Sequence, residues 1–242
     1  MLNEYVVMDM EMTGLSPYKD KIIEIGAIKI IDGKVVEEFQ TLVNPNIKIS
    51  EKITDITGIS NEMVKRKPFI DEILQDFIHF IGKSVIIGHN LVFDYSFLMQ
   101  AIYNNKMNEE CEIRRLGIDT LKIARKVLSA DEEKTLGALS KKYNIYDDNY
   151  HRALNDAYMT MKLYKILCEE FEDETLEFKP EEYFYKPKKE RTPTKREFEY
   201  VEKLMETLSI SPEVDIYKMT QSELNRYADY IRLNQYTLAG KK

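Results

Sequence analysis

Two carboxylates, Asp9 and Glu11, stand two positions apart in a run of apolar, β-leaning residues that begins at Tyr5. Because side chains alternate along a strand, both carboxylates are expected on one face, with Met8 and Met10 on the other. Adjacent carboxylates repel one another unless a cation lies between them. The common interpretation of such a pair is a solvated strand edge, but acidic residues are depleted in strands. The pair is therefore a candidate for part of a metal site.

A third carboxylate, Asp94, follows a short apolar strand predicted from Val85 to Gly88 and stands in the first turn of a helix predicted from about Val92 to Asn104. One interpretation is that Asp94 complements the helix dipole, worth a few tenths to about 1 kcal/mol. The other is that it joins Asp9 and Glu11. Phe93 and Phe97 beside it fit the core, or a wall against which a base stacks.

A fourth carboxylate, Asp156, and His151 stand at the start of a long helical pattern from Arg152 to Phe171. Ala153 and Ala157 are one turn apart, so this helix can lie close on a sheet and carry Asp156 towards it. A lone histidine is more often satisfied structure than a catalyst. The chain has only 3 histidines, however, and two of them lie in these carboxylate-bearing segments, which favours a functional role for His151.

These carboxylates need a sheet to position them. The strands Tyr5 to Met10, Ile22 to Ile31 and Val35 to Leu42, with a hairpin signal at Asp32-Gly33, predict an antiparallel meander. Helical patterns follow at Asn61 to Val64, Ile70 to Ile81, Ile118 to Leu128 and Leu136 to Tyr143. Strands followed by alternating elements predict an α/β fold with a mixed sheet flanked by helices.

Composition divides the chain into a main domain and an appendage. The expected main domain is residues 1–175, followed by a linker at 176–193 that carries the basic run from Lys186 to Arg196. Thr194 to Leu208 and Thr220 to Leu233 predict a small helical module at 194–242. The module is too poor in large apolar groups to be stable alone, so we expect it to lean on the main domain or on a partner.

The overall charge of −7 argues against bulk electrostatic binding of nucleic acid, unless metal ions supply the positive field at the carboxylates. The chain has neither a signal-peptide pattern nor a run of apolar residues long enough to span a membrane, so a cytoplasmic protein without membrane contact is expected. Cys111 and Cys168 have no metal-site spacing and are expected to be reduced and structural.

Taken in order, the motifs resemble those of the histidine-bearing branch of the DEDD superfamily of 3′→5′ exonucleases, and most closely the epsilon-type proofreading exonucleases of bacterial polymerases. The likeness extends from about Tyr5 to Phe171. It rests on three runs: Asp9-x-Glu11-x-Thr13-Gly14, then His89-Asn90-x-x-Phe93-Asp94-x-x-Phe97-Leu98, then His151-Arg152-Ala153-Leu154-x-Asp156-Ala157. Three motifs in this order are far more specific than any one of them.

The resemblance implies a ribonuclease H-like fold and a catalytic site. Its metal ligands would be Asp9, Glu11, Asp94 and Asp156, holding two divalent cations, with Glu11 also catalytic and His151 the general base. Carboxylate oxygens suit Mg²⁺ or Mn²⁺ rather than zinc. A histidine with a pKa near 6.5 suits proton removal at neutral pH.

The resemblance also implies contacts to the terminal nucleotide from Met12, Thr13, Gly14, Ile59, His89, Asn90 and Phe93. Relatives usually carry Thr where this chain has Met12, which puts substrate preference in doubt but not metal binding. The expected substrate is a single-stranded or frayed 3′ end of DNA, with a polymerase or repair protein as partner. A ribonuclease of the oligoribonuclease or ribonuclease T type shares every ligand and stays open, as does a non-catalytic scaffold subunit. The basic run before the C-terminal module fits nucleic-acid contact, partner docking or a solvated linker.

Overall fold

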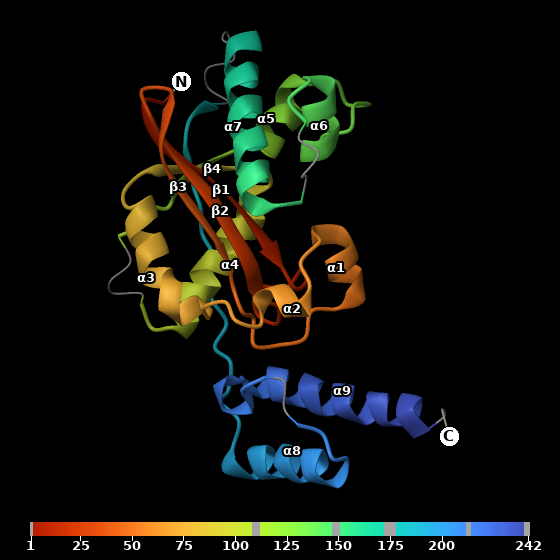
Figure 1. The fold of residues 1–242 in the computed structure, drawn as a ribbon. Helices are drawn as coiled ribbons and strands as arrows, with labels where there is room; N and C mark the ends of the chain where they lie inside the picture. The colour runs from red at the N-terminus through yellow and green to blue at the C-terminus, as the bar shows by residue number, and fades with distance from the viewer. Residues whose placement is uncertain (1, 108–111, 147–150, 172–177, 212–213, 240–242) are drawn as a thin grey trace. The chain divides into compact units, whose positions relative to one another are not determined.

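The computed structural model describes residues 2–107, 112–146, 151–171, 178–211 and 214–239 (Figure 1). The chain divides into two compact units. The first comprises Met1–Asn44 and Ile49–Pro187, and the second comprises Pro45–Lys48 and Lys188–Lys242. No helix among the described residues is long and apolar enough to cross a membrane.

The first unit is built on a mixed sheet whose strand order in the described residues is β3-β2-β1-β4-β5-β6. The strands are β1 (Glu4–Met12), β2 (Ile22–Ile31), β3 (Lys34–Leu42), β4 (Val85–Gly88), β5 (Leu116–Asp119) and β6 (Glu181–Glu182). The first three form the predicted antiparallel meander. Strand β4 pairs parallel with β1 and with β5, and β6 closes the far edge antiparallel to β5.

Helices cover both faces of this sheet (Figure 1). One core joins the even-numbered residues of β1, such as Val6 and Met8, to α3 (Ile70–Ile81) and α4 (Leu91–Asn104). The other core joins Tyr5 and Val7 to α5 (Thr120–Val127), α6 (Leu136–Lys142) and α7 (Ala153–Glu170). The alternation of β1 therefore assigns each of its side chains to one layer of a three-layered α/β/α domain.

Close contact between α7 and the sheet depends on small residues on both sides. Ala153 and Ala157 are fully buried, as their one-turn spacing predicted. On the sheet side, a Cβ atom added to Gly26 would lie 2.1 Å from the backbone nitrogen of Leu154. Gly26 is also the register partner of Asp9. The absence of a side chain at Gly26 thus sets how near the first turn of α7 comes to the strand that carries Asp9.

The predicted secondary structure needs correction in two places. The segment Ile118 to Leu128 does not begin as helix, because Ile118 and Asp119 complete β5 and Asp119 then caps α5 by accepting a hydrogen bond from the Leu121 backbone nitrogen at 2.9 Å. Helix α1 (Glu51–Thr57), capped by Ser50, was not predicted. Together with α2 (Asn61–Val64) it encloses a small core that contains Ile59.

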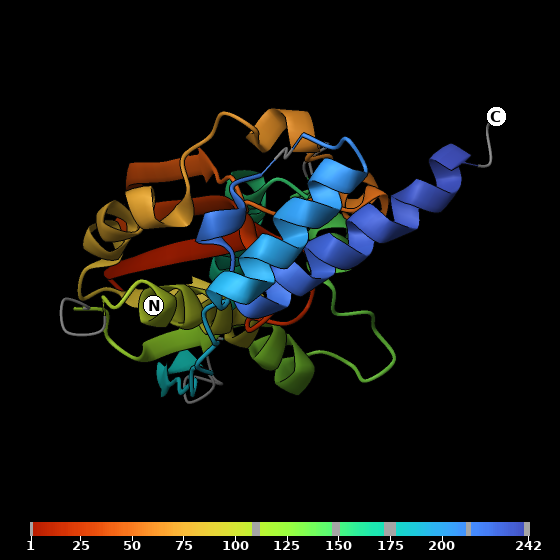
Figure 2. The same ribbon diagram turned by 90° about the horizontal axis from the view of Figure 1, so that it is seen from below.

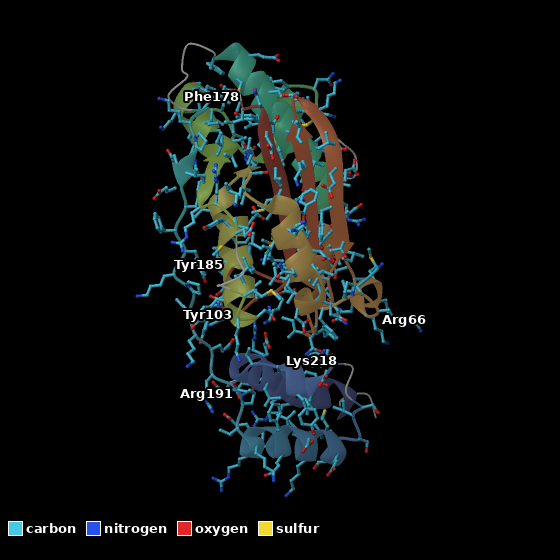
Figure 3. All side chains as sticks on the ribbon, turned by 90° about the vertical axis from the view of Figure 1, so that its left-hand side faces the viewer. Arg66, Tyr103, Phe178, Tyr185, Arg191 and Lys218 are labelled. Carbon is cyan, nitrogen blue, oxygen red and sulfur yellow. The ribbon has the colours of Figure 1, made fainter. Side chains whose placement is uncertain are left out.

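The expected linker at 176–193 also needs correction, because the first unit continues to Pro187. Strand β6 pairs with β5, and Tyr183 is 5% exposed against the α4 face. The hydroxyl of Tyr185 donates to Oε1 of Gln100 on α4 at 2.9 Å, and Figure 3 shows Tyr185 beside the domain. The tyrosines anchor a segment whose prolines and charges had suggested a linker.

The second unit contains α8 (Lys195–Thr207), a 3₁₀ turn (Ile216–Lys218) and α9 (Gln221–Ala239). Helices α8 and α9 run side by side (Figure 2) over a core that includes Val201, Met205 and Leu224. Thr194 caps α8 in a capping box with Glu197. Residues Pro45–Lys48 belong to this unit, where Asn46 exchanges two hydrogen bonds with the Asp215 backbone at 2.8 and 2.9 Å.

Candidate active site

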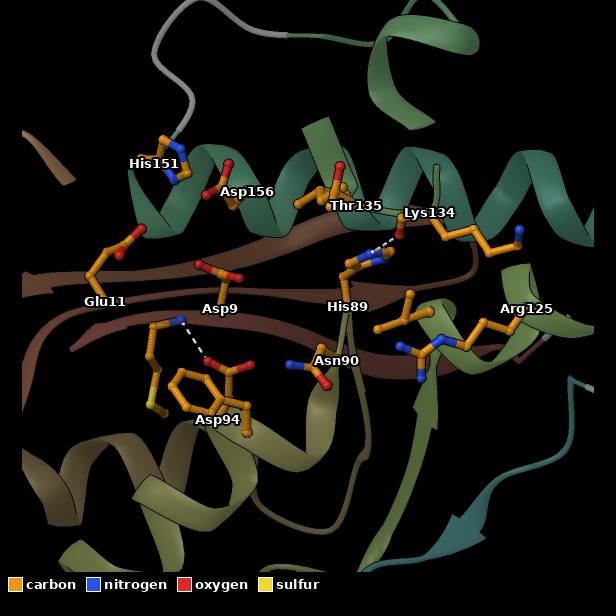
Figure 4. Close-up of a pocket in the computed structure, with 14 residues that line it drawn as sticks. Asp9, Glu11, His89, Asn90, Asp94, Arg125, Lys134, Thr135, His151 and Asp156 are labelled. Carbon is orange, nitrogen blue, oxygen red and sulfur yellow. Dashed lines mark hydrogen bonds between the residues drawn. The ribbon is translucent and has the colours of Figure 1, made fainter. Parts of the chain in front are cut away.

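Four carboxylates and a histidine from three separate segments line one pocket of about 450 Å³ in the first unit (Figure 4). They are Asp9, Glu11, Asp94, Asp156 and His151. A pocket of this size lies in the usual range for ligand sites. The structure thus brings together all five residues expected to bind metal or to catalyse.

Strand alternation and helix starts explain how these side chains meet. Asp9 and Glu11 continue the row of Tyr5 and Val7 that faces α7, and they replace apolar side chains where that core opens. Asp156 stands in the first turn of α7. Asp94 stands in the first turn of α4, and its Oδ1 accepts a hydrogen bond from the Met10 backbone nitrogen at 3.1 Å.

The carboxylates hold protons strongly in the absence of cations. Burial raises the pKa of Asp94 to about 8. Burial, reinforced by the charges of Asp156 and Glu24, raises the pKa of Glu11 to about 8. Burial and then the charge of Asp94 raise the pKa of Asp9 as well. A cation between these oxygens would stabilise the ionised carboxylates and so offset both burial and mutual repulsion, which is the behaviour expected of a metal site.

The donor set fits hard divalent ions. One ligand atom from each of Glu11, His151 and Asp156 lies within 4.8 Å of the others. Asp9 and Asp94 line the same pocket and add further carboxylate oxygens. Oxygen-rich sites of this kind suit Mg²⁺ or Mn²⁺.

His151 lies directly before α7 with a left-handed backbone, φ 68°. Burial lowers the pKa of its imidazole, which favours the neutral form of the ring that a general base requires. Asp147 and Asp148, which precede it in the sequence, lie outside the described residues, as does Cys111. Cys168 is a free, half-buried thiol.

The histidine of the second motif has another environment. Nε2 of His89 lies 2.9 Å from the Lys134 carbonyl oxygen, and Nδ1 lies 2.9 Å from Oγ1 of Thr120. Burial lowers the pKa of His89, so a neutral ring donates through Nε2 to the carbonyl. Both ring nitrogens thus face protein atoms, although His89 lines the pocket.

The predicted nucleotide contacts divide into two groups. His89, Asn90 and Phe93 line the pocket with the carboxylates, whereas Phe97 is buried in the core. The second group does not line this pocket: it comprises Met12, Thr13, Gly14 and Ile59. The side chains of Met12 and Ile59 are 5% and 0% exposed, and each packs in a different hydrophobic core. Their contacts to a nucleotide stay predictions.

Several residues of the site were not singled out from the sequence. Glu24 on β2 is wholly buried beside the carboxylates. The sequence feature that could have identified it is the one that identified Asp9, a charged residue inside an apolar strand. Arg125, Lys134 and Thr135 line the pocket from α5 and the segment before α6. Nothing in their local sequence distinguishes them from solvated surface residues.

Buried carboxylates grouped with a histidine at the end of a mixed sheet have the chemistry that divalent-metal sites for phosphoryl transfer require. Residues 6–164 match the family model RNase_T, described as "Exonuclease". The chain belongs to this exonuclease family.

Curated relatives support this membership. The chain is 38% identical over 172 residues to DNA polymerase III PolC-type of Clostridium perfringens, covering 71% of this chain and 12% of that protein. It is 32% identical over 166 residues to DNA polymerase III subunit epsilon of Aquifex aeolicus, covering 69% of this chain and 81% of that protein. The chain therefore spans about an eighth of the PolC-type relative but most of the epsilon subunit.

Solved structures show the same fold. Exonuclease X in complex with 5′ overhanging duplex DNA superposes with a TM-score of 0.56 and 28% identity, covering 69% of this chain and 93% of that one. Escherichia coli Exonuclease I in complex with a dT13 oligonucleotide gives a TM-score of 0.61 at 20% identity, covering 72% and 44%. The first unit thus has the ribonuclease H-like exonuclease fold that the resemblance implied.

Proposed function

We propose that this chain is a 3′→5′ exonuclease that hydrolyses the terminal phosphodiester of DNA and releases nucleoside monophosphates. The observation that carries the proposal is the convergence of Asp9, Glu11, Asp94 and Asp156 with His151 in one pocket. Membership of the exonuclease family and the DNA in the Exonuclease X structure support it.

The four carboxylates would hold two divalent cations, Mg²⁺ or Mn²⁺, and such ions supply Lewis-acid activation of water and stabilisation of the leaving oxygen. His151, neutral near pH 7, accepts the proton of the attacking water. Glu11, whose carboxylate lies within 4.8 Å of a ring nitrogen of His151, orients that water. Phe93 offers a half-buried aromatic face to the terminal base, and Asn90 a polar group beside it.

DNA is favoured over RNA as substrate because the relatives are named as parts of DNA polymerase III. The same relatives support a role beside a DNA polymerase or in DNA repair. An exoribonuclease would use the same carboxylates. The two candidate activities therefore differ in whether the substrate strand contains deoxyribose or ribose. A scaffold role would require a pocket unable to bind metal.

Digestion of matched single-stranded DNA and RNA oligonucleotides tests this choice. We expect the protein with Mg²⁺ to convert the DNA to nucleoside 5′-monophosphates, resolved by chromatography, at a higher kcat/KM than the RNA. A higher kcat/KM on RNA would make the protein an exoribonuclease. Failure to bind Mn²⁺ by calorimetry, together with no digestion of either strand, would favour the scaffold.

A further inference from the structure

The pocket that holds the carboxylates also has a basic wall. Arg125 on α5, with Lys134 and Thr135 ahead of α6, lines it together with the acidic residues. Figure 4 shows Arg125 on the far side of the pocket from Glu11 and His151, with His89 and Asn90 between them. The chain as a whole carries a net charge of −7. A cation that lines this pocket is therefore a candidate for binding an anionic group of a ligand.

Arg125 forms no ion pair with a carboxylate among the residues that the structure describes. Its side chain is exposed, and the residues that the structure describes give it neither a hydrogen bond nor an ion pair. Its neighbour Lys122, by contrast, pairs with Glu181 at 2.9 Å. The Lys134 ammonium group donates to the carbonyl oxygens of Ser129 and Glu132 at 2.5 and 2.9 Å. Arg125 is thus the cation of this wall whose guanidinium stays available.

A hydrogen-bonded clamp fixes this wall relative to the carboxylates. His89 joins the Lys134 carbonyl to Thr120, the first residue of α5. Oδ1 of Asp119 accepts from the backbone nitrogens of both Asn90 and Leu121, at 2.8 and 2.9 Å. The start of α4, which carries Asp94, is therefore tied to the start of α5, one turn before Arg125. A cation so held can recognise a fixed position on a ligand.

We propose that Arg125 binds a phosphate of the substrate strand on the 5′ side of the scissile bond, with His89 as the positioning residue of the basic wall. The proposal rests on the proposed function. If the scissile phosphate lies at the carboxylates, only a nucleoside with a free 3′ hydroxyl remains beyond it, and that nucleoside carries no further phosphate. A second phosphate in the pocket therefore belongs to the upstream strand. The guanidinium fork suits a phosphate and remains charged at every working pH.

The test compares substrates that have or lack an upstream phosphate. The p-nitrophenyl ester of thymidine 5′-phosphate carries only the scissile phosphate, whereas short oligodeoxynucleotides carry more. For Arg125→Ala we expect the ratio of kcat/KM on an oligonucleotide to kcat/KM on the ester to fall roughly tenfold, the usual weight of one charge-assisted hydrogen bond. Arg125→Lys should recover part of the ratio. Arg66→Ala is the matched control, since Arg66 is also exposed but does not line the pocket (Figure 3).

Salt dependence gives a second readout that a loss of folding would not mimic. Removing one phosphate contact to a single strand should reduce the slope of log affinity against log salt by about 0.7, measured by fluorescence anisotropy of a 5′-labelled oligonucleotide. Equal losses on oligonucleotide and ester, or an unchanged salt slope, would overturn the role of Arg125. If the wild type hydrolysed neither substrate, the proposed function would fail. An anisotropy slope reduced only in Arg125→Ala would still support the phosphate contact.

Discussion

The guanidinium of Arg152 holds the carboxylate of Glu24 in a two-pronged ion pair, with Nη2 2.7 Å from Oε1 and Nε 3.1 Å from Oε2. Oε2 also accepts from the Ala153 backbone nitrogen at 3.1 Å, at the start of α7. Glu24 is the register partner of Glu11 on the neighbouring strand. The pair therefore fixes the end of α7 that carries His151 and Asp156, and it sets a positive charge against the acidic cluster.

Removing Arg152 should destabilise the fold. Arg152→Ala leaves the fully buried Glu24 without its counter-charge, and an uncompensated buried charge costs about 3 kcal/mol. We expect urea unfolding to show a loss of this size. Lys65→Ala serves as the control, because its pair with Glu62 is exposed and should contribute less than about 1 kcal/mol. Equal losses in the two variants would contradict the structural role given to Arg152.

A side chain at Gly26 should disturb the site by displacing the first turn of α7. Gly26→Ala places a methyl group against the backbone of Leu154 and must push the first turn of α7 outward. We expect a loss of roughly 1–3 kcal/mol in unfolding free energy, and slower hydrolysis because Asp156 moves with the helix. In Gly58→Ala the added methyl group meets open space, so only its left-handed backbone, φ 70°, carries a cost of about 1 kcal/mol. Full activity in Gly26→Ala would show that the position of α7 is not limiting.

The metal-free protein should lose stability as pH rises. Glu11 and Asp94 have folded-state pKa values of about 8, above those of unfolded carboxyls near 4. Between about pH 4 and pH 8 the folded state therefore binds more protons than the unfolded state, and the free energy of unfolding falls with rising pH. Chemical denaturation with chelator across this range should show the decline.

Mg²⁺ should counter this decline, with proton release on binding, because it takes the place of the protons. Calorimetry in buffers of different ionisation enthalpy counts the released protons. Stability that rises with pH in chelator would mean that these carboxyls are not buried, mutually repelling groups.

His151→Ala separates a general base from a metal ligand. As a base, His151 contributes roughly 10²–10⁴ to the rate, and its loss should leave metal affinity near that of the wild type. As a ligand beside Glu11 and Asp156, its loss should weaken Mn²⁺ binding measured by calorimetry. Loss of affinity in step with rate would contradict the role of base, and unchanged rate would leave His151 structural.

Periodic segments could be predicted from the sequence because their pattern is local. The stripe from Ile70 to Ile81 and the apolar run from Ile22 to Ile31 match α3 and β2 at both ends. Strand β5 was missed because its four residues pass directly into α5, and β6 because its two residues depend on pairing with β5. Short elements defined by tertiary contacts leave little trace in periodicity.

The same contrast applies to the site. Asp9 and Glu11 could be predicted because charges conflict with an apolar strand pattern, and Asp94 and Asp156 because the three motifs together place them with that pair. The partners of Glu24 and the wall containing Arg125 could not be predicted in this way. They depend on contacts such as Glu24 to Arg152, 128 positions apart, and His89 to Lys134, 45 positions apart.

Digestion of a 5′-labelled single-stranded DNA by the wild type and by Asp9→Asn, with Mg²⁺ or with chelator, tests whether this pocket is the exonuclease site. The substitution keeps the shape of Asp9 and removes one charge from the cluster, so the metal-free fold should be as stable as the wild type or slightly more so. We expect a ladder of products shortened from the 3′ end for the wild type with Mg²⁺ only. The same ladder from Asp9→Asn, or from the wild type with chelator, would contradict the assignment of this pocket as a metal-dependent exonuclease site.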